Sequence, residues 1–200
     1  MSDDYVIREL KPELLDDYLR FFDTDAFADN PQWASCYCYF PQAPHETEKW
    51  TDRTGEQNRA DVCRLIERGE MQGYLAFHEG RAVAWCNAAP RTRMTILDEV
   101  AEAEQIGSIV CFVVAKAHRG RGVARKLLEA ALAGFKEQGL PLAEGYPRRD
   151  AHDEASSHFG PLSMFLSAGF APHTETEGNT VVRKDLTAET QSSRGGNAEG

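Results

Sequence analysis

The stretch at residues 108–135 constrains the fold more than any other part of the sequence. Residues 108–115, SIVCFVVA, form an apolar run rich in β-branched residues, which is typical of a strand covered on both faces. A basic turn with two glycines follows, HRGRG at 118–122. The apolar residues after it recur at the spacing of one helical face: Val123, Ala124, Leu127, Leu128, Ala131, Leu132 and Phe135. The stretch therefore predicts a buried strand joined by a tight turn to a helix that begins near Gly122 and stops by Gly139.

This turn has the features of an anion site. Gly120 and Gly122 leave backbone N–H groups open to close approach, and the positive end of the helix dipole attracts negative charge, so a phosphate is the predicted ligand. Two common phosphate motifs are excluded. The sequence contains no P-loop, G-x-x-x-x-G-K-S/T. A dinucleotide fingerprint requires Gly or Ala where the chain has Arg125, and an acidic residue about 20 positions further on, where the chain reads QGL.

The letters at 119–124 match a different signature. Arg119, Gly122 and Ala124 spell R-x-x-G-x-A, which resembles the acetyl-CoA signature of the GNAT N-acetyltransferase superfamily. The strand before it, the helix after it and the later MFLSAGF segment at 164–170 fall in the order of that family. The resemblance implies that acetyl-CoA is the co-substrate. Its predicted contacts are Phe112, Val113 and Val114 for the pantetheine arm, and Arg119, Gly120, Arg121, Gly122, Val123 and Ala124 for the pyrophosphate.

The rest of the chain supplies the other elements. Strands are predicted at 5–10, 73–78, 81–89, 140–146, from Phe170 and at 180–186, and helices from Pro12, at 55–68 and from Pro161. This order is similar to that of the GNAT fold, which implies an α/β (α+β) domain at 1–186 with a central mixed, mostly antiparallel sheet flanked by helices. Residues 187–200 are polar and are predicted to be a disordered tail.

The resemblance implies transfer of an acetyl group to a primary amine of a small molecule or protein. Some family members carry a glutamate base at the start of the central strand, where this chain has Ser108, a residue able to hold a relay water. Glu104, four residues upstream, is the predicted carboxylate base. A backbone N–H near Val113 is the predicted donor to the oxyanion. Many members place a tyrosine near the CoA thiolate where this chain has Phe165, so Ser163 or water supplies the proton, or the thiolate leaves unassisted.

Candidate acceptor-binding residues come from aromatic segments. The connection between the first two predicted helices contains WASCYCYF at 33–40 between prolines, and in this family it flanks the acceptor pocket. Trp33, Tyr37 and, from the hairpin, Trp85 are the predicted contacts, because aromatic rings stack on a cationic amine. Packing in the core explains the same residues equally well.

Composition limits the partners. A net charge of −10 disfavours nucleic-acid binding; it either attracts a cationic amine or only maintains solubility. No apolar run approaches the roughly 18 residues of a membrane span, and the N-terminus has no signal-peptide core, so we expect a cytoplasmic monomer or homodimer without a membrane partner. A non-catalytic acyl-CoA sensor and a purely structural protein with this fold remain alternatives.

The five cysteines are an odd number, which favours reduced thiols over a disulfide framework. Cys36-x-Cys38 lacks the spacing of a zinc site, so no metal is predicted. Cys111 lies in the predicted buried strand and is assigned to packing, because acetyl transfer in the GNAT family is normally a direct attack.

Overall fold

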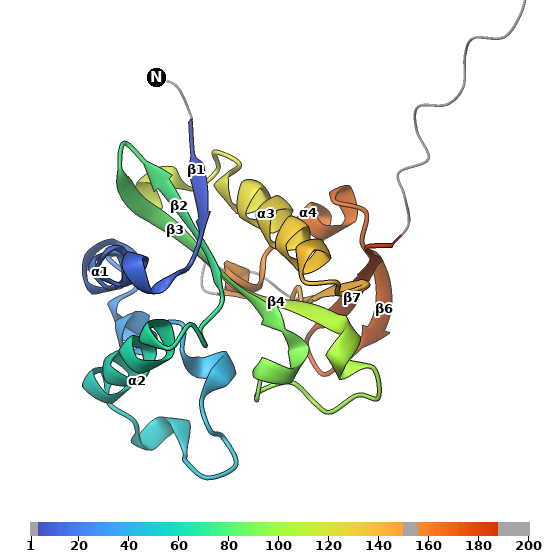
Figure 1. Ribbon diagram of the computed structural model, residues 1–200, viewed down its shortest axis with the longest axis horizontal. Helices are drawn as coiled ribbons and strands as arrows, with labels where there is room; N and C mark the ends of the chain where they lie inside the picture. Colours follow the sequence, from blue (N-terminus) through green and yellow to red (C-terminus); the bar gives the residue numbers. More distant parts are fainter. Residues whose placement is uncertain (1–3, 150–155, 188–200) are drawn as a thin grey trace, which may run out of the picture.

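A seven-stranded sheet forms the centre of the computed structural model, which describes residues 4–149 and 156–187 (Figure 1). Its strands are β1 (Val6–Glu9), β2 (Gly73–His78), β3 (Arg81–Pro90), β4 (Ile106–Val114), β5 (Leu142–Gly145), β6 (Ala171–Glu175) and β7 (Thr180–Asp185). They lie in the order β1-β2-β3-β4-β5-β7-β6, and every neighbouring pair is antiparallel except β4 and β5. The predicted mixed, mostly antiparallel sheet is confirmed.

Helices cover both faces of this sheet. The first face carries α1 (Leu15–Arg20) and α2 (Gly55–Glu67), and the second carries α3 (Val123–Glu137) and α4 (Leu162–Ser167) (Figure 1). The side chain of Thr54 caps the start of α2 by accepting from the backbone N–H of Gln57. The apolar stripe of α3 is buried against the sheet, as its spacing predicted.

Two predicted segments differ in detail. The helix predicted from Pro12 consists of a 3-10 turn (Pro12–Leu14), α1 and a π-helical turn (Phe21–Asp25). The central strand begins at Ile106, earlier than predicted, because its first four residues pair with β5. The other segments with defined turns are 3-10: Pro31–Cys36, Phe40–Gln42, Trp50–Asp52, Arg91–Arg93, Ala103–Gln105, Lys116–His118 and Ser156–Phe159. The predicted tail from residue 188 lies outside the described residues.

The divergence of β4 and β5 is the feature that positions the site. The two strands pair only from Ile106–Leu142 to Ile109–Gly145, where β5 ends, whereas β4 continues to Val114. Opposite β3, Val110 is an extra residue in β4, because Asn87 faces Cys111 while Ala88 faces Ile109. A bulge of this kind bends a strand and interrupts its pairing. Among the described residues, it leaves the edge of β4 beyond Ile109 without a pairing strand on the β5 side.

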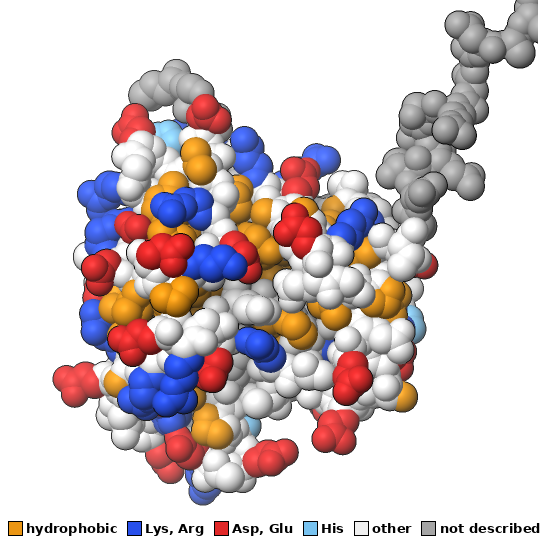
Figure 2. Space-filling model, viewed as in Figure 1, with side chains coloured by type: hydrophobic (Ala, Val, Ile, Leu, Met, Phe, Trp, Pro, Cys, Tyr) orange, Lys and Arg blue, Asp and Glu red, His pale blue; other side chains and the backbone are white. Residues whose placement is uncertain are grey.

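The surface carries both signs of charge. Figure 2 shows acidic and basic side chains interspersed over one face, with small apolar patches between them. Within the described residues, no helix combines the length and the apolar character needed to cross a membrane.

Candidate active site

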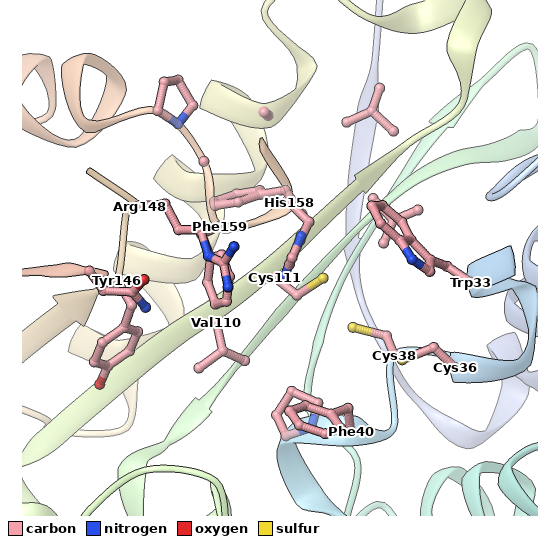
Figure 3. Close-up of a pocket in the computed structure, with 18 of the residues that line it drawn as sticks. Trp33, Cys36, Cys38, Phe40, Val110, Cys111, Tyr146, Arg148, His158 and Phe159 are labelled. Atoms are coloured by element: carbon pink, nitrogen blue, oxygen red, sulfur yellow. The ribbon is translucent and has the colours of Figure 1, made fainter. Parts of the chain in front are cut away.

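A pocket of about 980 Å³ lies at the gap between β4 and β5. One wall is the turn at 119–124 and the start of α3, and β4 forms the floor. Figure 3 shows Trp33 and Phe40 on one side, Tyr146, Arg148 and Phe159 on the other, and Val110 between them on β4. The pocket thus joins the predicted anion-binding turn to the aromatic loop that the sequence linked to an acceptor.

The turn is shaped by two left-handed glycines. Gly120 has φ 72° and Gly122 has φ 76°, and α3 begins at the next residue, Val123. The N-cap residue is Gly122, which has no side chain to cap the helix, so within the described residues the first N–H groups of α3 face open space. A Cβ at either glycine would meet no described atom within 4 Å, which shows open space at the positive end of α3. Gly120, Gly122, Val123 and Ala124, four of the predicted cofactor contacts, all line the pocket.

Arg119 and Arg121 were expected to add positive charge to the anion site, but the structure places their side chains differently. The Arg119 guanidinium forms a bidentate ion pair with Asp29, at 2.6 and 3.0 Å, and its Nε donates to the Val114 carbonyl at 3.0 Å. This hydrogen bond with Arg119 lowers the pKa of Asp29. Arg119 lines the pocket with its charge already paired, and Arg121 is not among the lining residues. The cradle is therefore made mainly of backbone groups.

The direction of the β4 backbone follows from one hydrogen bond. The Ala115 N–H donates to the Val83 carbonyl at 2.9 Å, so these opposite residues are a hydrogen-bonded pair. Hydrogen-bonded pairs recur every second residue in an antiparallel ladder, so Val113 and Trp85 are such a pair too. The N–H of Val113 consequently points to β3 and away from the gap.

The backbone groups of Phe112 and Val114 point the other way, toward the gap. Among the described strands, none pairs with them there, because β5 ends opposite Ile109. The Val114 carbonyl already accepts from Arg119, which agrees with this direction. Phe112, Val113 and Val114 all line the pocket, but only the N–H groups of Phe112 and Val114 point into the gap.

A buried polar network borders the pocket behind β4. The Tyr146 hydroxyl donates to Glu144 Oε2 at 2.9 Å, accepts from Arg91 Nη1 at 2.7 Å and shares a 2.7 Å hydrogen bond with Ser108. Arg91 and Arg183 both pair with the Glu144 carboxylate. Burial and the neighbouring Glu144 charge raise the pKa of Tyr146. Tyr146 and Arg91 line the pocket, whereas Ser108 is fully buried behind them.

The match to a family model decides the assignment. Residues 13–152 match the model of the Acetyltransferase (GNAT) family. The chain belongs to the GNAT family. No curated protein sequence matches it.

Solved structures share the GNAT fold at low identity. The chain is similar to the PaiA N-acetyltransferase of Thermoplasma acidophilum in complex with coenzyme A, with 13% identity and a TM-score of 0.56 over 91% of this chain and 99% of that one. An N-acetyltransferase of Staphylococcus aureus Mu50 is 13% identical, with a TM-score of 0.55 over 92% of this chain and 100% of that one. The putative acetyltransferase yncA of Salmonella typhimurium, solved with its cofactor acetyl-CoA, is 14% identical, with a TM-score of 0.53 over 94% of this chain and 98% of that one. At these identities the likeness shows the fold.

The GNAT domain does not bring the two predicted catalytic residues together. Glu104 is exposed on the 3-10 turn before β4 and does not line the pocket. Its neighbour Glu102 pairs with Arg183. Ser108 reaches the pocket only through Tyr146. Sequence reasoning missed Tyr146, although Glu144 and Tyr146 are polar groups on one face of a short predicted strand, a signal that could have found them.

Three predicted ligand contacts also lie away from the pocket wall. Phe165 is fully buried against Phe170, and Trp85 is fully buried against Tyr18, with ring centroids 5.2 and 5.0 Å apart. The hydroxyl of Tyr37 donates to an aspartate outside the pocket. Trp33 does line the pocket, together with aromatic residues that the sequence did not single out: Phe27, Phe40, Trp50, Tyr146, His158 and Phe159.

Metal ligands are not grouped in the described part of the chain. There, no set of three or more His, Cys, Asp or Glu side chains is arranged to hold a metal ion.

Proposed function

We propose that this GNAT protein transfers an acetyl group from acetyl-CoA to a primary amine of a small molecule or a protein. The observation that carries the proposal is the continuity of one pocket from the uncapped start of α3 to the open edge of β4. The turn offers N–H groups to a pyrophosphate. The edge offers backbone groups to the amide-rich pantetheine arm, as a sheet edge does to an added strand.

Under this proposal the reacting thioester lies near the β4 bulge. A donor extending from Gly122 along Val114 and Phe112 reaches Val110, which lies between Trp33 and Tyr146 in the pocket. Open N–H groups of the strand then stabilise the negative charge that develops on the thioester oxygen. The amine attacks the carbonyl carbon from the aromatic side, and the C–S bond breaks.

Tyr146 is the candidate proton donor to the departing thiolate. Tyr146 lines the pocket, and its hydroxyl is protonated at neutral pH; to give this proton to the thiolate, the hydroxyl must exchange its hydrogen bond to Glu144 for one to the sulfur. Ser108 and Arg91 hold this hydroxyl in place, so they act as positioning residues. The proton lost from the attacking amine returns to Tyr146 through water in the pocket.

The experiment combines calorimetry with acetyl-CoA and thiol release against a panel of primary amines. We expect acetyl-CoA to bind and at least one amine to release thiol. Tyr146→Phe lowers kcat about tenfold or more with the acetyl-CoA Kd unchanged, because it removes the hydroxyl and its hydrogen bonds but keeps the ring that lines the pocket. Glu104→Gln is the comparison variant. A fall in kcat for Glu104→Gln and none for Tyr146→Phe would move the proton path to Glu104.

A second candidate is a non-catalytic acyl-CoA-binding or sensing module. It is favoured by Phe165, which stands in the place of the tyrosine that many relatives use, and which is buried in the core. Acetyl-CoA binding without thiol release to any amine supports this sensor. Failure to bind acetyl-CoA excludes both candidates.

A further inference from the structure

Two cysteines meet in the pocket wall opposite the glycine turn. Cys38 lies in the loop after the 3-10 turn Pro31–Cys36, and Cys111 lies on β4 immediately after the Val110 bulge. Figure 3 shows their sulfur atoms pointing toward one another, and the two side chains share a hydrogen bond. Both residues line the pocket; Cys111 is partly exposed and Cys38 is only 2% exposed, so a small reagent has to reach the pair from the pocket side.

The sulfur of Cys38 is surrounded by hydrogen-bond donors. Asn87 Nδ2 lies 3.6 Å from it and also donates to the Cys38 carbonyl at 3.0 Å. The buried indole N–H of Trp85 makes no hydrogen bond of ordinary length in the described residues, but its nearness helps to lower the pKa of Cys38. Cys111 supplies its S–H. These groups stabilise a thiolate more than a thiol, because an anionic sulfur is the stronger acceptor.

The two thiols of the pair are consequently unequal. Burial opposes ionisation of Cys38, but the donor groups of Cys111, Asn87 and Trp85 around its sulfur together outweigh burial and lower the pKa of this thiol. The hydrogen bond to Cys38 and burial raise the pKa of Cys111. Burial also raises the pKa of Cys36 to about 11. Cys38 is therefore the nucleophilic member, and Cys111 retains its proton.

The backbone holds Cys38 in this position. Tyr37 and Cys38 are consecutive non-glycine residues in the left-handed region, with φ 48° and 50°. This conformation is disfavoured for residues with a Cβ and persists only where the surroundings impose it. Here the Tyr18 hydroxyl donates to the Tyr37 carbonyl at 2.6 Å, and Asn87 donates to the Cys38 carbonyl. Such strained residues concentrate at functional sites.

We propose that Cys38 and Cys111 form a reactive thiol pair that peroxide converts reversibly to a disulfide inside the pocket. The Cys38 thiolate attacks a peroxide oxygen, so an S–O bond forms as the O–O bond breaks, and the released hydroxide takes up a proton as water. Cys111 loses its proton and attacks the sulfenic sulfur of Cys38. The S–S bond forms, the S–O bond breaks, and a second water leaves. Peroxide accepts the two electrons that the thiols lose.

The disulfide acts on one half of the pocket. It ties the aromatic loop to β4 at the place where the acceptor amine enters under the proposed function. The turn at Gly120 and Gly122 belongs to the other wall and is left unchanged. Oxidation therefore blocks acetyl transfer while acetyl-CoA still binds.

The first test needs no enzymatic activity. The reduced full-length protein is treated with iodoacetamide, and the rate at each cysteine is followed by peptide mapping. We expect Cys38 to react about tenfold or more faster than Cys63, a partly exposed residue on α2 outside the pocket. Replacing the paired thiol by Cys111→Ala slows Cys38, and the matched Cys63→Ala leaves its rate unchanged. Equal rates at Cys38 and Cys63 in the wild-type protein overturn the proposal.

The second test follows oxidation. After hydrogen peroxide, non-reducing peptide maps should contain a Cys38–Cys111 disulfide that dithiothreitol removes, with the acetyl-CoA Kd within about twofold. Thiol release to an amine should fall about tenfold and recover on reduction. Two results reject the proposed thiol pair. One is sulfonic acid at Cys38 without any Cys38–Cys111 disulfide. The other is a Cys38→Ser variant that loses as much turnover after peroxide as the wild-type protein does. The disulfide forms whether or not an amine acceptor is found, so failure of the proposed function and failure of this inference are distinguishable.

Discussion

The two walls of the pocket are built in different ways. The turn wall, residues 112–114 and 119–124, presents backbone groups that the edge of β4 and the start of α3 place. The loop wall, residues 26–50, presents side chains from a segment whose regular structure is limited to short 3-10 turns. A backbone wall tolerates changes of side chain, provided that its glycines remain. A side-chain wall changes its chemistry with each substitution, which suits the half of the pocket that binds the acceptor under the proposed function.

The largest effect should come from filling the turn wall. Gly122→Glu places a carboxylate at the proposed phosphate site, so we expect the acetyl-CoA Kd to rise at least about 100-fold, or about 2.7 kcal/mol, by calorimetry. The matched control is Gly139→Glu, which has a similar φ of 75° and equally open surroundings at the other end of α3. It shares the backbone strain and should retain affinity. Normal acetyl-CoA binding by the Gly122 variant contradicts the phosphate assignment.

A change in the loop wall should affect the acceptor alone. Trp33→Ala removes an aromatic ring from the pocket, so we expect the KM for the amine to rise about tenfold, or about 1.4 kcal/mol, with the acetyl-CoA Kd unchanged. Trp85→Phe is the control, because Trp85 is fully buried outside the pocket lining. It should lower the unfolding temperature without changing this KM. Equal effects of Trp33→Ala and Trp85→Phe on the KM for the amine would contradict the assignment of Trp33 to the pocket wall and Trp85 to the core.

The contact between the two walls predicts a dependence of stability on pH. Arg119 lowers the pKa of Asp29, so the folded state holds this proton less tightly than the unfolded chain. The resulting stability is fully present above the unfolded pKa of about 3.9 and is lost as the pH falls through the folded value. Asp29→Asn should lower the free energy of unfolding by about 1 kcal/mol at pH 7, measured by urea denaturation.

This difference between wild type and Asp29→Asn should shrink as the pH falls below about 4. Glu129→Gln is the control, because Glu129 and its partner Arg125 are both more than half exposed, at 60% and 61%. It should have little effect on stability at any of these pH values. A constant difference for Asp29→Asn down to pH 2 would show that its effect does not come from the charge.

The smallest effect on turnover should come from Phe165→Tyr. The ring is fully buried, and a Cβ at Gly145 would lie 2.3 Å from it, so an added hydroxyl meets the core rather than the thiolate. We expect kcat to change less than about twofold while the protein loses about 1–3 kcal/mol of stability. A large rise in kcat would instead support a position of residue 165 next to the CoA thiolate, as the family resemblance implied.

Regular structure was predictable because its signals are local. The glycine turn, the apolar stripe of α3 and the hairpin of β2 and β3 each depend on residues within a few positions of one another. The helix predicted from Pro12 was less accurate, because periodicity does not distinguish an α-helix from the π-helical turn at Phe21–Asp25.

The side chains of the site were predicted less well for a physical reason. β3 and β4 are buried on both faces, so polar and apolar residues do not alternate, and the sequence cannot show that Trp85 faces the core. Glu144, Tyr146 and Ser108 come together only through the parallel pairing of β4 with β5. Trp33 and Tyr37 belong to one aromatic segment, and tertiary packing alone sends one into the pocket and the other toward Asp23.

The ion pair between Arg119 and Asp29 limits how this protein can be re-engineered. A graft of a relative's loop onto residues 26–50, made to change acceptor preference, would remove Asp29 and leave the Arg119 guanidinium beside the glycine turn without that carboxylate. The transplanted loop must therefore carry an acidic residue at the equivalent position, or position 119 must be changed with it. The loop wall and the turn wall can therefore be exchanged between relatives only together, with the residues at positions 29 and 119 matched.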